Sequence, residues 1–419
     1  MAWYHKLHNP EAYILSFFKW LVLGVVLGLL GGLLGTAFHY ALDWAAEFRA
    51  AHGALIWFLP LAGLPIVGLY RLCHMEKNSG TNEIIDDFNT RTDVNPLLAP
   101  LIFVSTFLTH LFGGSAGREG AALQLGGALG SVFGRVLRLS KEDRRVLVVS
   151  GMSAVFAALF GTPMTACLFS LEFMAVGTIF DPGLLPCFAA SFTASRVALA
   201  FGVPPTAFDL SYVLPLGPAN LLRVAALAVL VALVSLLFCD LMHHTERLLK
   251  RWIPNAFLRI AAGGAIVAAL TLLLRTQDYN GAGMNVVLRA LAGKALPLAF
   301  LLKMLFTAVT LGSGFKGGEI VPTFFIGATF GCVTAQLLGL DPGFGAALGL
   351  VGLFCCVTNS PITSLFLSVE MFGGGNLMAF AIMCVIGFVL SGNSGLYTSQ
   401  TLIYSKVRPD TVNRKVSGG

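Results

Sequence analysis

Charged side chains are scarce in this sequence. Asp, Glu, Lys and Arg make up 11% of its 419 residues and hydrophobic residues 56%, whereas about a quarter of an ordinary soluble protein is charged. Several stretches without any of these four residues reach or exceed the roughly 20 residues that span a bilayer: 20–42, 94–117, 146–171, 320–340, 342–369 and 371–405. This composition excludes a soluble globular protein and predicts an all-α polytopic membrane protein.

The sequence also lacks the patterns of metal, redox and hydrolytic sites. Its eight cysteines show no Cys-x-x-Cys spacing, which zinc and redox sites use, and neither a His-Glu-x-x-His motif nor a Ser/His constellation occurs. We therefore expect no metal, no cofactor and no enzymatic activity. The net charge of +6 does not indicate nucleic acid, because the basic residues stand mostly at the ends of apolar segments, as membrane proteins require.

Basic clusters mark the expected cytoplasmic side of the membrane. They lie at 71–77, 135–145, 247–251 and 406–415, and cytoplasmic loops carry an excess of Lys and Arg. A short N-terminal segment, 1–12, and a short C-terminal tail, 406–419, are both expected in the cytoplasm. The apolar stretch after Lys19 is too long for the core of a cleaved signal peptide and predicts the first membrane helix.

Two pairs of segments recur about 200 residues apart. Segment 162–172 resembles 360–370, each with a proline nine residues before a glutamate, and 114–130 resembles 312–331. The repeats predict two related halves, 13–205 and 206–405, and the placing of the basic clusters indicates that they are inverted. Inverted repeats in transporters place the substrate near the bilayer midplane, between broken helices.

A few charges lie in or beside these repeated apolar segments. Each is costly at membrane depth, by roughly 2.5–3.5 kcal/mol, so each is a functional candidate unless an ion pair gives it a structural role: Arg118, Glu119, Glu172, Lys303, Lys316, Glu319 and Glu370. Glu172 and Glu370 occupy equivalent positions at expected helix ends. For these two we favour a shared structural duty, accepting hydrogen bonds from loop N–H groups.

Glu119 is the second-to-last residue of a glycine-rich stretch, 113–120, that leads directly into a helical run. The unpaired N–H groups and the dipole of a helix N-terminus favour an anion there. An ionised Glu119 carboxylate can occupy such a site and leave it when protonated, which couples anion binding to protonation. The alternative is a structural salt bridge with a nearby Arg or Lys.

Two further glycine-containing segments have the same form. Segment 312–319 ends on Glu319, which either carries a proton or merely caps the next helix, and 78–82 offers the hydroxyls of Ser79 and Thr81, which ordinary N-capping also explains. Near the end of the last apolar segment, Tyr404 either reaches a central cavity or belongs to an interfacial aromatic belt.

Small residues recur at four-residue spacing in the first expected helix. Gly24, Gly28 and Gly32, together with Gly31 and Gly35, favour close contact with another helix. Packing within the chain is preferred over packing between two copies.

The three glycine-rich segments, the late tyrosine and the inverted halves together resemble the chloride-channel (CLC) family across nearly the whole chain. In that family the three helix starts usually read Gly-Ser-Gly-Ile-Pro, Gly-Arg-Glu-Gly-Pro and Gly-x-Phe-x-Pro. Here they read Asn-Ser-Gly-Thr-Asn at 78–82, Gly-Arg-Glu-Gly-Ala at 117–121 and Gly-Glu-Ile-Val-Pro at 318–322.

The resemblance implies a role for each of these residues. Glu119 corresponds to the gating glutamate that competes with the anion and carries the proton. The resemblance also implies a set of anion-binding residues, which contribute side chains or backbone amides or lie next to residues that do: Ser79, Gly80, Thr81, Arg118, Gly120, Ile320, Val321 and Tyr404. It also implies a homodimer with one pathway per subunit, in a bacterial inner membrane.

Departures from the common pattern indicate a branch of the family. Phe173 stands where chloride/proton exchangers carry an inner relay glutamate, and Glu319 in its Gly-Phe-Lys-Gly-Gly setting is similar to the fluoride/proton antiporter branch, where this glutamate assists the proton path. Val321 and Ser79 depart from that branch. We expect a transporter that exports fluoride in exchange for protons; the alternative is a chloride/proton exchanger or a passive chloride channel.

Overall fold

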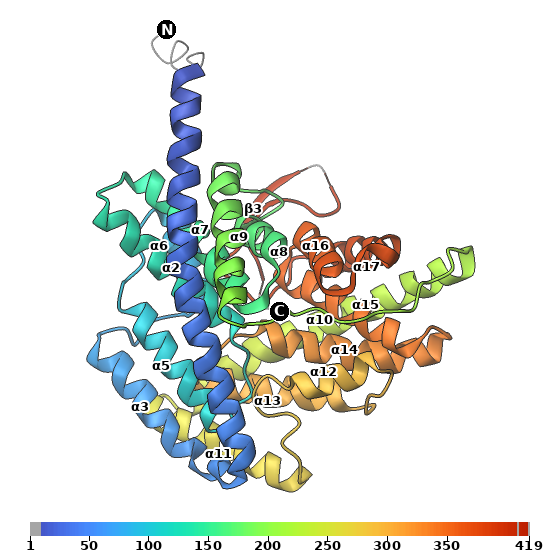
Figure 1. Ribbon diagram of the computed structural model, residues 1–419. Coiled ribbons are helices and arrows are strands. Elements are labelled where there is room, and N and C mark those ends of the chain that lie inside the picture. The colour runs from blue at the N-terminus through green and yellow to red at the C-terminus, as the bar shows by residue number, and fades with distance from the viewer. Residues whose placement is uncertain (1–9, 409, 418–419) are drawn as a thin grey trace.

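The computed structural model describes residues 10–408 and 410–417, and it is mainly helical (Figure 1). Its α-helices are α2 (Pro10–Ala51), α3 (Leu59–Leu72), α4 (Thr81–Thr90), α5 (Leu98–Leu111), α6 (Glu119–Val136), α7 (Lys141–Phe160), α8 (Pro163–Glu172), α9 (Leu184–Ala200), α10 (Pro218–Trp252), α11 (Ala256–Leu274), α12 (Met284–Leu291), α13 (Ala299–Ser313), α14 (Ile320–Leu338), α15 (Pro342–Thr358), α16 (Pro361–Phe372) and α17 (Leu377–Leu390). Short 3-10 helices lie at Gly53–Phe58, Asp181–Gly183 and Gly374–Asn376.

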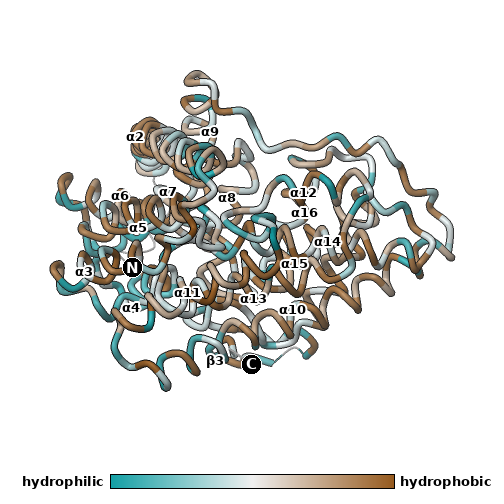
Figure 2. Tube along the Cα trace, turned by 90° about the horizontal axis from the view of Figure 1, so that it is seen from below, coloured by the Kyte–Doolittle hydropathy of each residue, from teal (hydrophilic) through white to brown (hydrophobic). Residues whose placement is uncertain are grey.

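Within the described part of the chain, six helical stretches are long and apolar enough to cross a membrane: Glu11–Ala51, Gly53–Leu72, Asp181–Ala200, Pro218–Trp252, Ala256–Leu274 and Ile320–Leu338. Several shorter apolar helices accompany them, and Figure 2 shows hydrophobic residues along most of the helical traces. The multi-span membrane protein expected from composition is confirmed. Most of the expected N-terminal segment, 1–12, lies outside the described residues, and α2 already begins at Pro10.

Helix α2 runs along the height of the molecule and extends beyond the other helices at its N-terminal end (Figure 1). Its 42 residues correspond to about 63 Å, roughly twice the thickness of a bilayer core. Its glycines face neighbouring helices. A Cβ on Gly28 would lie 2.6 Å from the Ala190 carbonyl oxygen of α9, and one on Gly31 would lie 2.6 Å from the Cβ of Ala154 in α7. The expected packing of this glycine stripe within the chain is confirmed.

We predict that Gly28→Ala lowers the midpoint of thermal unfolding in detergent. The added methyl group forces α2 away from α9, and overpacking of this kind costs about 1–3 kcal/mol. Gly68→Ala in α3 is the matched control, because nothing lies within 4 Å of a Cβ there and alanine favours a helix over glycine. An equal loss of stability in both variants would contradict the assigned contact.

Two helix pairs on either side of the chain's middle repeat one mode of packing. Helices α6 and α7 cross at glycines, where a Cβ on Gly126 would lie 2.2 Å from the Gly151 carbonyl oxygen. Helices α14 and α15 cross in the same way, with a distance of 2.3 Å from a Cβ on Gly327 to the Gly349 carbonyl oxygen. Between the two pairs, residues 201–217 form a segment without helix or strand.

A small sheet is the one departure from the all-α expectation in the described residues. Strands β1 (Ala175–Val176), β2 (Thr401–Tyr404) and β3 (Thr411–Lys415) lie in the order β1-β2-β3, with β1 parallel and β3 antiparallel to β2. The expected polar tail thus folds back on the body. Lys415 Nζ forms an ion pair of 3.0 Å with Asp86 Oδ1 of α4, so the tail is held against the helices.

Candidate functional site

The N-terminal ends of α6 and α14 meet through a pair of glycines. Gly117 N–H donates to the Gly318 carbonyl oxygen at 2.7 Å, and Gly318 N–H donates back to that of Gly117 at 2.8 Å. A Cβ on Gly318 would lie 2.4 Å from the backbone nitrogen of Gly120, so this approach requires glycine. Two helix N-termini, each with unpaired N–H groups and a positive dipole end, therefore lie side by side, where they favour negative charge.

The Glu119 carboxylate lies at this junction. The residue is 1% exposed, and its Oε2 accepts a hydrogen bond from the backbone N–H of Arg118 at 2.9 Å. The backbone N–H groups of its own residue and of Val321, the second residue of α14, also act on it electrostatically. Its Oε1 has no hydrogen-bond partner among the described residues. A single carboxylate thus interacts with both helix N-termini and keeps one oxygen unsatisfied.

The Arg118 guanidinium turns away from this junction toward α2. Its NH1 lies 2.8 Å from His39 Nδ1 and 3.2 Å from Asp43 Oδ1, while its Nε is 3.7 Å from Glu119 Oε1. The guanidinium thus contacts His39 and Asp43 and keeps a long ion pair with Glu119, and the expected anion-binding contribution of Arg118 stays a prediction. Sequence alone does not show whether the guanidinium or the backbone N–H of Arg118 lies at the junction.

A large cavity of about 1230 Å³ lies beside the junction; we name it the large pocket. Ser79, Gly80, Thr81, Glu319 and Tyr397 are among its lining residues, whereas Glu119 is not. Glu319 is partly buried and is the N-cap residue of α14. A Cβ on Gly120 would lie 3.2 Å from Glu319 Oε2, so the Glu319 carboxylate lies next to the residue that follows Glu119.

The first glycine-containing segment presents Thr81 to the junction. Ser79 is exposed at the pocket wall, whereas Thr81 is 5% exposed. Thr81 Oγ1 is 3.4 Å from the Gly120 carbonyl oxygen and 3.3 Å from Gln124 Nε2. Gly80 between them has a φ of 68°, which glycine adopts without strain. Of the two hydroxyl residues left open by the sequence, Thr81 is the one that reaches α6.

Tyr404 does not belong to this cluster, and the assignment of the central tyrosine needs correction. Tyr404 is 50% exposed and lies in strand β2. Tyr397 is 2% exposed, and its hydroxyl donates to Glu319 Oε2 at 3.4 Å. Its ring meets that of Phe173 edge-on at 4.7 Å. The signal that sequence reasoning missed is the position of Tyr397 directly after the break at Gly392–Gly395.

Ile320, Val321 and Gly120 lie in the first turns of α14 and α6 and are buried. None of them lines the large pocket. Phe173 is fully buried between Phe169 and Tyr397, so the residue expected at the inner relay position is an aromatic side chain packed in the core.

Lys303 has a local structural role. Its ammonium is fully buried and donates to the carbonyl oxygens of Tyr279 at 3.1 Å and Gly281 at 2.7 Å. It therefore fixes the connection between α11 and α12, which explains this charge without a ligand.

Glu172 and Glu370 cap each other's helices across the molecule. Glu172 at the end of α8 accepts from Ile362 N–H, Thr363 N–H and the Thr363 hydroxyl at 3.1, 2.8 and 2.6 Å at the start of α16. Glu370 accepts from Met164 N–H, Thr165 N–H and the Thr165 hydroxyl at 2.9, 2.8 and 2.6 Å at the start of α8. The shared structural duty expected of this pair is confirmed.

We predict that Glu172→Gln and Glu370→Gln each lower the thermal stability of the protein in detergent. Both replacements keep the size of the side chain but weaken charge-assisted bonds to helix N–H groups, at a cost of about 1–3 kcal/mol each. Glu76→Gln, at an exposed position on the rim of the large pocket, is the control. If the melting temperature is unchanged in both capping variants, the reciprocal caps do not stabilise the protein.

Comparisons with known proteins agree with this architecture. Residues 62–392 match the family model "Voltage gated chloride channel". A relative from Pseudomonas syringae pv. tomato (strain ATCC BAA-871 / DC3000), named "Chloride/fluoride channel protein", is 37% identical over 410 residues, which cover 96% of this chain and 91% of the relative. A more distant one, "H(+)/Cl(-) exchange transporter ClcA" from Yersinia pestis bv. Antiqua (strain Angola), is 24% identical and covers 85% of this chain and 82% of its own length.

Among solved structures, a CLC-type fluoride/proton antiporter superposes with a TM-score of 0.88 at 33% identity, over 91% of this chain and 98% of the other. A slow cyanobacterial Cl⁻/H⁺ antiporter superposes with a TM-score of 0.77 at 21% identity, over 89% and 94% of the two chains, a likeness of fold alone. The family model and the first relative decide the assignment. This chain belongs to the voltage gated chloride channel family, the CLC family.

Proposed function

We propose that this chain is a secondary transporter that exports fluoride in exchange for protons. The observation that carries the proposal is the Glu119 carboxylate, buried where the N-termini of α6 and α14 converge. The likeness to a fluoride/proton antiporter over nearly the whole chain supports fluoride as the substrate, as does the "Chloride/fluoride channel protein". A chloride/proton exchanger is the second candidate, favoured by the exchangers among its relatives.

In the proposed cycle, Glu119 and the anion compete for one place. Backbone N–H groups of the first turns of α6 and α14 stabilise either the ionised carboxylate or a fluoride ion. Protonation of Glu119 removes the charge that these groups hold, so the side chain yields its place to the anion. The exchange of one negative charge for another couples anion movement to proton movement.

Glu319 is the proposed second station for the proton. Its carboxylate lies beside Gly120 and lines the large pocket, so a proton that reaches it from Glu119 has a route to water. The Tyr397 hydroxyl and the Thr81 hydroxyl lie next to this route. We assign the anion-coordinating side chains to Thr81 and Tyr397, with Ser79 and Gly80 at the pocket wall.

Several architectural expectations belong to the same proposal. Matched glycine crossings and reciprocal glutamate caps support the division into two inverted halves, 13–205 and 206–405. We place the large pocket and both termini on the cytoplasmic side of a bacterial inner membrane, with segments 1–12 and 406–419 there, and infer a homodimer with one pathway in each subunit. The chain needs no cofactor for this exchange.

Reconstitution in liposomes tests the central proposal. We expect fluoride efflux, followed with a fluoride electrode, to be accompanied by proton uptake, followed with a trapped pH dye. Glu119→Gln, which cannot ionise, and Glu319→Gln should both abolish proton movement, while Glu76→Gln on the pocket rim should leave it intact. Proton coupling that survives Glu119→Gln would refute the gating role. Chloride efflux equal to fluoride efflux would favour the second candidate.

The two tyrosines provide a matched pair of variants. Tyr397→Phe removes the hydroxyl beside Glu319, and we expect transport to fall about fivefold, corresponding to the roughly 1 kcal/mol of an ordinary hydrogen bond. Tyr404→Phe should transport at the rate of the unmodified protein. The reverse pattern would restore Tyr404 as the central tyrosine.

A further inference from the structure

His39 of α2 makes a contact that fixes which of its ring nitrogens carries the proton. The residue is 7% exposed, and its Nδ1 lies 2.8 Å from Arg118 NH1. A guanidinium only donates hydrogen bonds, because arginine is not deprotonated in proteins. The Nδ1 atom of His39 must therefore accept this bond. The ring is then neutral, with its one proton on Nε2.

The second ring nitrogen completes a closed set of three side chains. His39 Nε2 lies 3.0 Å from Asp43 Oδ2, one helical turn further along α2. Arg118 NH1 also donates to Asp43 Oδ1 at 3.2 Å. The tautomer that Arg118 imposes on His39 is thus the one that donates to this carboxylate. Neutral His39 and Asp43 together hold the Arg118 guanidinium against α2.

Another nitrogen of the Arg118 guanidinium faces the candidate site. Its Nε is 3.7 Å from Glu119 Oε1, the buried oxygen that has no hydrogen-bond partner in the described part of the chain. A hydrogen bond between a guanidinium and a carboxylate is about 2.7–2.9 Å long. The contacts with α2 therefore hold Arg118 too far from Glu119 for such a bond.

A second proton on His39 is incompatible with this arrangement. Both ring nitrogens donate in the protonated form, so the Nδ1–H would face an N–H of Arg118, with two positive groups 2.8 Å apart. Protonated His39 keeps its bond to Asp43, because Nε2 still donates. Arg118 loses the acceptor that His39 provides, and Glu119 Oε1 is an acceptor with a vacant position on its other side.

We propose that His39 is a pH-sensitive positioning residue: in its neutral form it holds the Arg118 guanidinium away from Glu119, and its protonation releases the guanidinium to Glu119 Oε1. This inference rests on the proposed function and deepens it. A guanidinium bonded to Glu119 favours the ionised carboxylate, which then keeps the place that the anion needs. Protonation of His39 therefore slows fluoride export.

In the proposed orientation, the proton reaches His39 from the external side. Lys19 of α2 pairs with Asp143 at 2.7 Å, within the basic cluster 135–145 that we expect in the cytoplasm. Asp43 follows Lys19 in α2 by 24 residues, about 36 Å, whereas a bilayer core is about 30 Å thick. The Asp43 side chain is 48% exposed. External water therefore reaches the carboxylate that is bonded to His39.

Other titratable groups lie on the elements that pack against α2, which are α5, α6, α7, α9 and the 3-10 helix after α2. Helix α5 contributes His110, which is buried and acts on Asp43 electrostatically. Arg196 of α9 is exposed, the charges of α7 lie in its first turns, and the 3-10 helix has no titratable side chain. Within α2, the Tyr40 ring meets the His39 ring edge-on at 5.4 Å. His110 therefore needs a variant of its own in the test.

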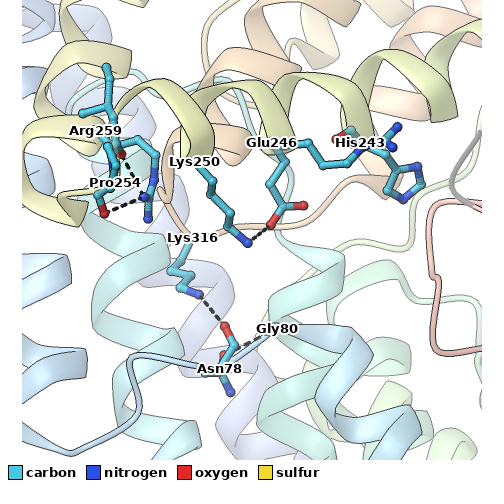
Figure 3. Close-up of polar contacts among 10 residues, drawn as sticks. Asn78, Gly80, His243, Glu246, Lys250, Pro254, Arg259 and Lys316 are labelled. Atoms are coloured by element: carbon cyan, nitrogen blue, oxygen red, sulfur yellow. Dashed lines mark hydrogen bonds and ion pairs between the residues drawn. The ribbon is translucent and has the colours of Figure 1, made fainter.

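A histidine at the large pocket provides a matched control. His243 lies on α10 with Glu246 and Lys250 and lines the large pocket (Figure 3). Its Nε2 is 3.2 Å from the Leu396 carbonyl oxygen, which only accepts, and its Nδ1 has no partner among the described residues. A second proton on His243 therefore binds to Nδ1 and breaks no hydrogen bond.

The experiment is fluoride efflux from liposomes between about pH 5 and pH 8, the range in which histidine changes its charge. The pH is equal on both sides, so the orientation of the protein in the liposome does not matter, and each rate is divided by the rate of the same protein at about pH 8. His39→Gln offers Arg118 a neutral acceptor and Asp43 a donor at every pH.

We expect the relative rate of His39→Gln at about pH 5 to exceed that of the unmodified protein by about tenfold, the lower end of the effect of a hydrogen bond to a charged group. His110→Gln and His243→Gln should follow the profile of the unmodified protein. An equal rise in either of them would assign the slowing in acid to that histidine or to histidine charge in general. A relative profile of His39→Gln identical to that of the unmodified protein would make its contact with Arg118 a structural tie.

A double variant tests whether His39 acts through Arg118. Arg118→Met removes the guanidinium, so adding His39→Gln to it should leave the pH profile unchanged. A further change in the profile, in protein that elutes as a single species on size exclusion, would show that His39 acts on transport without Arg118 and would contradict the proposal.

The tautomer of His39 provides a readout that does not depend on transport. In protein with ¹⁵N-labelled histidine, the nuclear magnetic resonance signals that disappear in His39→Gln belong to this ring. At about pH 8 we expect its proton on Nε2. A proton on Nδ1 would overturn the inference, whereas unmodified protein that moves fluoride without protons would refute the proposed function.

Discussion

The pair of backbone hydrogen bonds between Gly117 and Gly318 is the constraint on which the candidate site depends. In a bilayer no water satisfies exposed backbone groups, so irregular backbone is tolerated only where protein covers it. The N–H and carbonyl groups of these two glycines bond to each other. Because Gly318 has no Cβ, the N-termini of α6 and α14 can come into direct backbone contact. A side chain on Gly318 would push the two helix ends apart. The positive potential of the two N-termini would then no longer be concentrated at the site.

The buried carboxylates around this constraint fall into two groups according to how completely their oxygens are satisfied. Glu172 and Glu370 each accept three hydrogen bonds from the start of a helix in the other half of the chain. Such fully hydrogen-bonded carboxylates stabilise the fold, because a movement of either helix would leave a buried charge without partners. Glu119 has an unsatisfied oxygen and Glu319 a weak bond to Tyr397. Incomplete satisfaction lets a carboxylate change its protonation and position.

Sequence reasoning identified the features that repeat and missed those that depend on distant contacts. The glycine-rich segments and the roles of Glu172 and Glu370 were predictable because each occurs twice at one spacing. The direction of the Arg118 side chain depends on His39 and Asp43 in α2, and no local pattern encodes it. The choice of Tyr397 over Tyr404 depends on how the chain turns after α17. Strand β1 forms because it pairs with β2, more than 200 residues later in the chain.

Glu119 and Glu319 follow the paired glycines at different offsets. Glu119 is the second residue after Gly117, whereas Glu319 is the first after Gly318. One residue along an α-helix turns a side chain by about 100°, so equivalent backbones direct the two carboxylates differently. One lies against both helix N-termini, and the other faces the large pocket. If both glutamates stood at the same distance from the paired glycines, the two carboxylates would occupy equivalent positions on either side of the Gly117–Gly318 contact. Their negative charges would then repel each other. The single-residue difference gives one backbone motif a carboxylate buried between two helix N-termini and a separate carboxylate open to the pocket.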